Sequence, residues 1–166
     1  MLLDGFRLII FDADETLRRT TVPGKPCPHG PAEWMLLPNV RATLRHLPWM
    51  QPGGPQVGLA SNQDHVGYGH LSFDAARGLL RDLAVAAIGV APPDVALQLC
   101  PHTLEIDCEC RKPKPAMLLK IMGHYAIGAE DTLLVGNSEV DRLAADAAGI
   151  GFVSAASLFG SNEGRR

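Results

Sequence analysis

The chain has 166 residues, enough for a full hydrophobic core, and we expect residues 1–166 to form a single domain. Apolar residues make up 46% and charged residues 20% of the chain, a composition that excludes a disordered protein. The formal net charge of −3 argues against non-specific affinity for nucleic acid.

We expect no secretory signal in the N-terminal residues. Asp4 and Arg7 interrupt the apolar stretch of residues 1–10, and no small-residue cleavage site follows. No apolar run is long enough to span a bilayer. We therefore expect a cytoplasmic protein with no membrane partner, in which cysteines are more typical of metal ligands than of disulfides.

Apolar runs that end in polar residues or glycine predict five strands, with helices between them. The expected strands are Leu8–Asp12, Val57–Ser61, Asp94–Leu99, Thr132–Gly136 and Ile150–Val153. The expected helices run from an Asn39 cap to Leu47, from a Ser72 cap to about Val85 with Phe73, Ala76, Leu80 and Leu83 inward, from Pro115 to His124, and from a Ser138 cap to Ala148 with Gly149 as the terminating residue. This alternation predicts an α/β, Rossmann-like parallel sheet with helices on both faces. The connections Arg18–Leu37 and Leu99–Pro115 are long, which makes them candidates for function.

Two carboxylates follow the first predicted strand. Asp12 and Asp14 are spaced i, i+2, so in extended backbone their side chains point the same way. Ligands of open α/β sheets bind at the carboxyl ends of the strands, and two neighbouring carboxylates there require a cation or an altered pKa. A strand that runs into an acidic turn is the alternative interpretation.

Hydrogen-bond donors and cations occur at two later points in the chain. Ser61 and Asn62 stand at the end of the second strand and can donate to phosphate oxygens, although an Asx or ST turn is the favoured interpretation when they are taken alone. Arg111, Lys112 and Lys114 precede a helix N-terminus, which favours anions. A solvated basic turn is the alternative interpretation of these cations.

Oxygen ligands follow the strand that ends at Gly136. Asn137, Glu139 and Asp141 suit a hard cation such as Mg²⁺, although a capped surface helix is the alternative. Taken in order, the acid pair, the hydroxyl, the lysine and this acidic segment predict one site at one edge of the sheet.

Cysteine and histidine gather in the loop of about residues 99–112. Cys100, His102, Cys108 and Cys110 provide the ligand set of a closed structural Zn²⁺ site, and a disulfide is the weaker alternative in a cytosolic protein. Cys27-Pro28-His29 has no second pair nearby in the sequence, and we interpret it as a loop with an isolated thiol.

Together these motifs resemble the haloacid dehalogenase (HAD) superfamily of phosphatases. Asp12-x-Asp14-x-Thr16 matches its first motif, Ser61 the second, Lys112 the third and Gly136–Asp141 the fourth. Two further features resemble the zinc-bearing subgroup that contains histidinol-phosphate phosphatase and D-glycero-D-manno-heptose 1,7-bisphosphate phosphatase. They are the run Cys-x-Cys-Arg-Lys-Pro and the pair Asn62-Gln63 after the motif hydroxyl. The resemblance covers about residues 8–153, and the spacings leave no room for a large cap domain.

The resemblance implies a role for each motif residue. Asp12 would be the nucleophile that forms an aspartyl-phosphate, and Asp14 the general acid and base. Ser61 and Lys112 would hold the phosphoryl oxygens. The resemblance also implies that Asn62, Gln63 and Arg111 bind the substrate. It implies that Mg²⁺ is held by Asp12, Asp14, Asn137 and Asp141.

Two positions depart from the superfamily pattern. Glu15 replaces the usual Gly after the second Asp and adds negative charge. Asn137 replaces an Asp, so we expect weaker Mg²⁺ binding, for which Asp141 can compensate.

The expected function is Mg²⁺-dependent hydrolysis of a small polyol or sugar phosphate. The His102–Cys108 gap resembles histidinol-phosphate phosphatase, whereas Lys114–Leu119 and Gly69 resemble the heptose enzyme. The alternatives are a polynucleotide 3′-phosphatase, which the acidic balance disfavours, and a catalytically weak zinc-stabilised binding module. The sequence does not indicate an oligomeric state.

Overall fold

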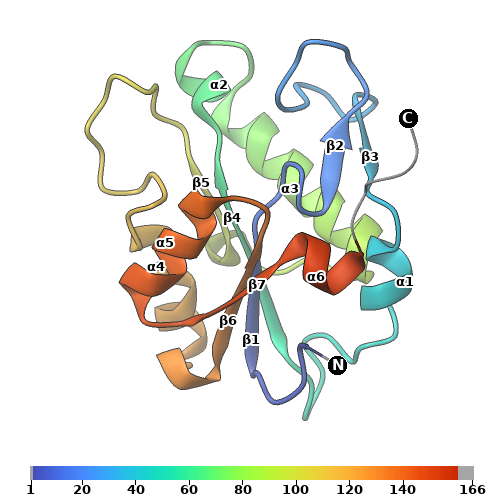
Figure 1. Ribbon diagram of the computed structural model, residues 1–166. Coiled ribbons are helices and arrows are strands. Elements are labelled where there is room, and N and C mark those ends of the chain that lie inside the picture. Colours follow the sequence, from blue (N-terminus) through green and yellow to red (C-terminus); the bar gives the residue numbers. More distant parts are fainter. Residues whose placement is uncertain (1, 161–166) are drawn as a thin grey trace.

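The computed structural model describes residues 2–160, and its centre is a parallel sheet with the strand order β5-β4-β1-β6-β7 (Figure 1). The predicted parallel sheet is confirmed. The predicted strand Asp94–Leu99 differs at its start, because Asp94–Ala96 forms a 3-10 turn (η1) that follows Pro93. The strand bounds are β1 Leu8–Phe11, β4 Gln56–Asn62, β5 Leu97–Cys100, β6 Thr132–Gly136 and β7 Gly151–Ser154.

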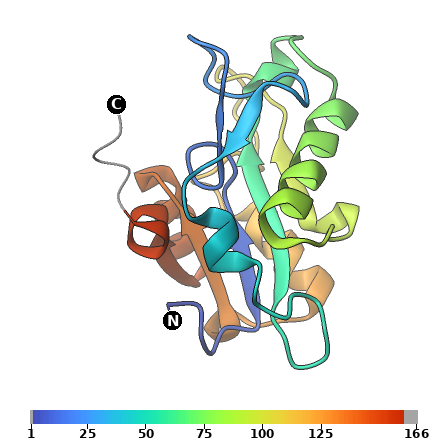
Figure 2. The same ribbon diagram turned by 90° about the vertical axis from the view of Figure 1, so that its right-hand side faces the viewer.

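Alternating side chains of β1 enter two separate cores, one on each face of the sheet. Ile9 and Phe11 belong to the core under α1 and α3, whereas Leu8 and Ile10 belong to the core under α4 and α5. A strand buried on both faces reads as a continuous apolar run, which is why Leu8–Phe11 has no polar position. Helices therefore cover both faces, as predicted (Figure 1, Figure 2). Their bounds are α1 Val40–Leu44, α3 Phe73–Ile88, α4 Ala116–Tyr125 and α5 Glu139–Ala148.

Local capping chemistry sets the ends of two helices as the sequence predicts. The Ser72 side chain accepts a hydrogen bond from the Ala75 amide at the start of α3. Ser138 and Asp141 form a reciprocal capping box at the start of α5, and Gly149 ends it with a φ of 71°. These helix ends follow from contacts within one turn, which is why the sequence alone predicts them.

Two predictions about helices are wrong. Asn39 does not cap α1, because its backbone is left-handed and its side chain donates to the Phe159 carbonyl instead, at 2.9 Å. The helix then ends at Leu44, short of the predicted Leu47. Phe73 is 40% exposed rather than inward, because it stands in the first turn of α3 and its ring contacts the Arg77 guanidinium.

The long connection Arg18–Leu37 contains a hairpin that the sequence did not predict. Strands β2 (Arg18–Thr20) and β3 (Trp34–Leu36) pair antiparallel in a separate sheet. Their residues lack the apolar alternation of a typical strand. The hairpin, α2 (Asp64–Gly67) and the loop after β5 all rise from the carboxyl end of the main sheet (Figure 1). Another short helix, α6 (Ala155–Phe159), packs against the core under α1.

The described residues contain no large cap domain between the strands, as expected. In the same part of the chain, none of the helices has the length and apolar composition that a membrane span requires.

Candidate active site

The Asp12 carboxylate lies at the carboxyl end of β1, buried to 8% exposure. Its Oδ1 accepts a hydrogen bond from the Lys112 ammonium at 2.8 Å, and its Oδ2 accepts one from the Thr16 hydroxyl at 2.9 Å. Both oxygens are thus oriented by a donor, and the backbone amide of Asp12 is held by the Val135 carbonyl. This arrangement fixes the direction in which the carboxylate can meet a ligand.

Asp14 has a different set of partners from Asp12. Its Oδ1 accepts from the Arg18 guanidinium at 2.8 Å, and its Oδ2 accepts from the Gln63 amide at the same distance. Arg18 is 1% exposed, and the sequence analysis did not single it out, although it lies four residues after Asp14. Gln63 also donates to Ser61 Oγ at 2.8 Å, so one amide joins the acid to the hydroxyl.

The Lys112 ammonium is the centre of the buried charge cluster. It donates to Asp12, to Asp141 Oδ1 at 2.6 Å and to the Ala60 carbonyl at 2.8 Å. Burial opposes its charge, yet the two carboxylates raise the pKa of Lys112 above its usual value. Burial also raises the pKa of Asp12, and the negative charges of Asp141 and Asp14 add to this against the opposing effect of Lys112. The buried cluster places two carboxylates on one ammonium, so it holds an excess of negative charge, which a cation would offset.

Asn62 holds the backbone of the lysine segment rather than facing open space. Its amide nitrogen donates to the Lys112 carbonyl at 3.1 Å, and its oxygen accepts from the Lys112 amide at 3.0 Å. This paired contact fixes the position from which the lysine side chain starts. The neighbouring Arg111 has a buried Nη1 that finds no hydrogen-bond partner among the described residues. Arg111 lines an open groove of about 500 Å³ between α5 and the loop of residues 99–112, which we call the zinc loop.

Asn137 and Asp141 lie beside the Asp12 carboxylate but have different surroundings. The Asn137 side-chain oxygen lies 3.2 Å from the Thr16 hydroxyl and borders a second pocket with Glu15. Asp141 is 2% exposed, and its Oδ2 accepts from the Ser138 hydroxyl at 2.8 Å and from two backbone amides. Both Asp141 oxygens are therefore already used within the protein.

Glu15 has a left-handed backbone with a φ of 62°. A side chain at such a position is strained, whereas glycine adopts it freely. The conformation explains why the superfamily usually has glycine here.

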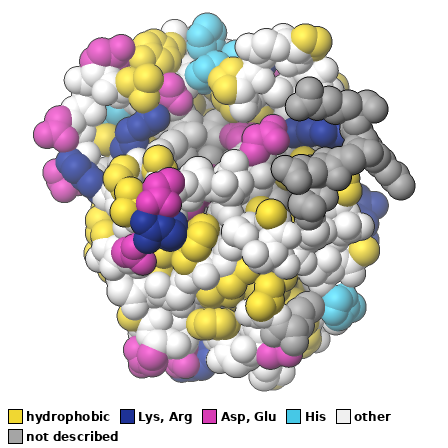
Figure 3. Space-filling view, viewed as in Figure 1, with side chains coloured by type: hydrophobic (Ala, Val, Ile, Leu, Met, Phe, Trp, Pro, Cys, Tyr) yellow, Lys and Arg dark blue, Asp and Glu magenta, His cyan; other side chains and the backbone are white. Residues whose placement is uncertain are grey.

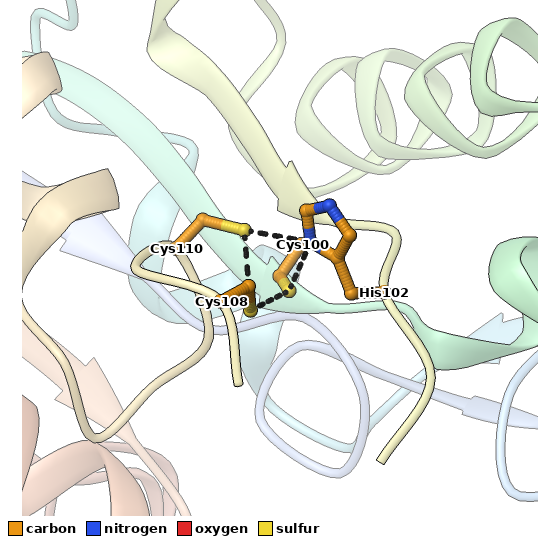
Figure 4. A group of neighbouring side chains, drawn as sticks. All are labelled: Cys100, His102, Cys108 and Cys110. Carbon is orange, nitrogen blue, oxygen red and sulfur yellow. Dashed lines mark hydrogen bonds between the residues drawn. The ribbon is translucent and has the colours of Figure 1, made fainter. Parts of the chain in front are cut away.

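The four residues of the zinc loop converge into one cluster, as predicted (Figure 4). Cys100 Sγ lies 3.5 Å from both His102 Nδ1 and Cys108 Sγ, and Cys110 Sγ lies 3.1 Å from His102 Nδ1. A tetrahedral Zn²⁺ with bonds of about 2.0–2.3 Å places its donor atoms about 3.3–3.8 Å apart. The donor set and its spacing therefore fit Zn²⁺. The Lys114 ammonium braces the loop through Asp107, Glu109 and the Cys108 carbonyl.

Cys27 and His29 lie in a loop and the Cys27 thiol is free, as predicted, but the thiol is not isolated. The fold brings both side chains to His65, and all three potential ligand atoms lie within 4.8 Å of one another. Sequence spacing gave no signal for this group, because His65 follows a strand far along the chain.

Comparison with protein families places most of the chain in one of them. The polynucleotide kinase 3 phosphatase family matches residues 7–158. D-glycero-beta-D-manno-heptose-1,7-bisphosphate 7-phosphatase of Pseudomonas putida is 31% identical over 152 residues, covering 90% of this chain and 77% of that protein. The histidine biosynthesis bifunctional protein HisB of Campylobacter jejuni is 30% identical over 95 residues, which are 55% of this chain and 26% of that protein.

Solved structures with the same fold include phosphatases. The D,D-heptose 1.7-bisphosphate phosphatase from B. bronchiseptica, complexed with magnesium and phosphate, has a TM-score of 0.72 and 29% identity, covering 89% of this chain and 79% of that one. A HAD-like phosphatase from Mesorhizobium loti has a TM-score of 0.64 at 23% identity, covering 87% and 69%, and supports the fold alone.

Proposed function

This chain belongs to the polynucleotide kinase 3 phosphatase family and is a phosphatase of the HAD superfamily. We propose that it is a Mg²⁺-dependent phosphomonoesterase that acts through an aspartyl-phosphate. One observation carries the mechanism. Asp12 and Asp14 lie two positions apart, yet Asp12 is oriented by Lys112 and Thr16, and Asp14 by Arg18 and Gln63. Separate partners allow the two carboxylates to perform separate tasks.

In the first step Asp12 attacks phosphorus and forms an O–P bond, while the bond from phosphorus to the substrate alcohol breaks. Asp14 in its protonated form gives its proton to the leaving oxygen. In the second step Asp14 takes a proton from water, which attacks phosphorus and releases inorganic phosphate and the Asp12 carboxylate. The Gln63 amide donates to both Asp14 and Ser61. It therefore fixes the position of the Ser61 hydroxyl, the proposed contact to phosphoryl oxygens, relative to the Asp14 carboxylate.

The oxygen donors around Asp12 fit Mg²⁺. We assign the Asp12 carboxylate, the Asp14 backbone carbonyl and the Asn137 amide oxygen as its ligands, because the cluster holds excess negative charge and these donors are hard oxygens. Bound Mg²⁺ would neutralise charge between the nucleophile and the phosphate. The sequence also predicts Asp141 as a ligand, but its hydrogen bonds support a positioning role toward Lys112 instead.

Asn62 and Gln63, which the resemblance assigns to substrate binding, are proposed here as positioning residues. The amide of Asn62 is used by the Lys112 backbone, and that of Gln63 by Asp14 and Ser61. Arg111 remains the proposed substrate contact, because its buried Nη1 has no partner within residues 2–160 and its side chain lines the groove. A guanidinium there suits a hydroxyl or an anionic group of the substrate.

A small polyol or sugar phosphate is the substrate class that the surroundings support best. The groove is walled by the zinc loop, and named relatives act on a heptose bisphosphate. A polynucleotide needs several free cations for its phosphates. Lys114, which lines this groove, is however paired with Asp107 and Glu109.

Hydrolysis of a polynucleotide 3′-phosphate is the second candidate, because the matching family carries that description. The test is release of inorganic phosphate from a panel of sugar phosphates, polyol phosphates and a 3′-phosphorylated oligonucleotide, with and without Mg²⁺. We expect activity on the small esters that rises saturably with Mg²⁺ and is abolished in Asp12→Asn, while the exposed Asp146→Asn control retains it. Activity on the oligonucleotide alone would overturn the substrate class. Equal rates in the native chain and Asp12→Asn would support a non-catalytic binding module.

A further inference from the structure

A second cluster of potential metal ligands lies outside the zinc loop. Cys27 and His29 come from the connection between β2 and β3, and His65 comes from α2. The Cys27 sulfur and one ring nitrogen of each histidine lie within 4.8 Å of one another. Histidine side chains gather at the surface above these segments (Figure 3). Two segments distant in sequence thus present one thiol and two imidazoles to a common point.

The close contacts in this cluster fit a metal site better than a packing contact alone. His29 Nε2 lies 2.6 Å from His65 Nδ1, so two ring nitrogens face each other directly. The ring of His70 stacks on His29 at 5.0 Å and lies 4.9 Å from the ring of His65. Zn²⁺ binds sulfur at about 2.3 Å and imidazole nitrogen at about 2.0–2.1 Å, so the facing nitrogens need to separate by only about 1 Å.

The three potential ligands are buried or half-buried, as is usual for the ligands of a structural metal site. Cys27 is 7% exposed, and His29 and His65 are half-buried, so the thiol lies beneath the imidazoles. Soft thiolate and imidazole ligands select Zn²⁺ over the hard cation proposed for the carboxylates. His70, whose exposed ring stacks on His29, or a water molecule would complete a tetrahedral set.

We propose that Cys27, His29 and His65 bind a second Zn²⁺, distinct from the ion of the zinc loop, and that this ion fastens the 21–33 loop to α2. The position has a consequence for the active site, because α2 directly follows Gln63, whose amide donates to both Asp14 and Ser61. The ion would therefore hold the segment that follows Gln63, next to the proton-transfer group. The assignment does not depend on the identity of the substrate or on activity.

The test is metal stoichiometry of the full chain, stripped of metal under reducing conditions and titrated with Co²⁺ and then Zn²⁺. We expect the native chain to bind two equivalents, Cys27→Ser one, the matched control Cys100→Ser one, and the double variant none. The Co²⁺ spectrum of Cys27→Ser should keep the strong thiolate charge-transfer band of the zinc loop and lose the weaker contribution from a single thiolate.

Two further measurements test the proposal even if the Cys27→Ser variant does not fold. His65→Gln, on the surface helix, should also bind one equivalent, and the second Zn²⁺ equivalent should slow alkylation of Cys27 in the native chain at least tenfold. A native chain that binds a single equivalent, with unchanged alkylation of Cys27 on adding Zn²⁺, would overturn the proposal and leave a hydrogen-bonded histidine pair.

Discussion

Replacing Asp141 by Asn separates its positioning role from the direct Mg²⁺ ligation that the superfamily pattern implies. The native carboxylate accepts from the Lys112 ammonium through one oxygen, and from the Ser138 hydroxyl and two backbone amides through the other. An amide has only one acceptor oxygen. Whichever way the Asn side chain turns, its NH₂ group therefore faces hydrogen-bond donors.

The loss in stability can be worked from these contacts. A charge-assisted hydrogen bond is worth about 1.5–3 kcal/mol and a helix cap about 1 kcal/mol. Lys112 keeps Asp12 and the Ala60 carbonyl as partners, so its charge is not left unpaired. We expect Asp141→Asn to lower the free energy of unfolding by about 2–4 kcal/mol, which for a chain of this size lowers Tm by about 5–15 °C.

The assay is urea denaturation and thermal unfolding of the native chain, Asp141→Asn and the control Asp146→Asn. Asp146 lies on the same helix but pairs with Arg142 at the surface, so its loss should change stability by less than about 0.5 kcal/mol. The Mg²⁺ concentration for half-maximal activity should change little in Asp141→Asn. Native-like stability together with a tenfold or greater increase in that Mg²⁺ concentration would refute the reasoning and make Asp141 a direct ligand.

The remaining predictions concern the zinc loop, the groove, a strained backbone position and a buried phenol. Cys108→Ser should abolish Zn²⁺ binding at the loop and lower the free energy of unfolding by about 4 kcal/mol, whereas the exposed Glu109→Gln keeps both, as metal analysis and unfolding curves would show. Arg111→Met should raise KM for the best substrate about tenfold with little change in kcat; a loss confined to kcat would argue against substrate binding. Glu15→Gly should raise the free energy of unfolding by about 0.5–1 kcal/mol in the same unfolding assay, because it relieves a left-handed residue; an unchanged or lower value contradicts this. Burial raises the pKa of Tyr125 to about 12, so the stability that its phenol contributes is present below its unfolded pKa of about 10 and is lost as the pH rises through 12. In an alkaline absorbance titration, the phenolate signal missing from Tyr125→Phe should appear near pH 12 in the native chain; a midpoint near its ordinary value would contradict burial.

Local sequence patterns were sufficient for most of the framework. The strand Thr132–Gly136 was predicted with its observed ends, and the caps at Ser72 and Ser138 form as expected. These features depend on apolar periodicity and on hydrogen bonds within one helical turn. The hairpin β2–β3 could not be predicted in the same way, because its two three-residue strands show no apolar alternation and are defined by their pairing with each other.

The order of strands and motif residues along the chain is enough to predict which chemical groups meet at the carboxyl edge of the sheet. Strands in a parallel sheet end on the same side, so residues that follow different strands are brought together by topology alone, and Lys112 does contact Asp12 and Asp141. The tertiary structure decided how these groups pair. Arg18 on Asp14, Asn62 on the Lys112 backbone and His65 beside Cys27 depend on side-chain directions and on contacts between distant segments, which residue spacing does not encode.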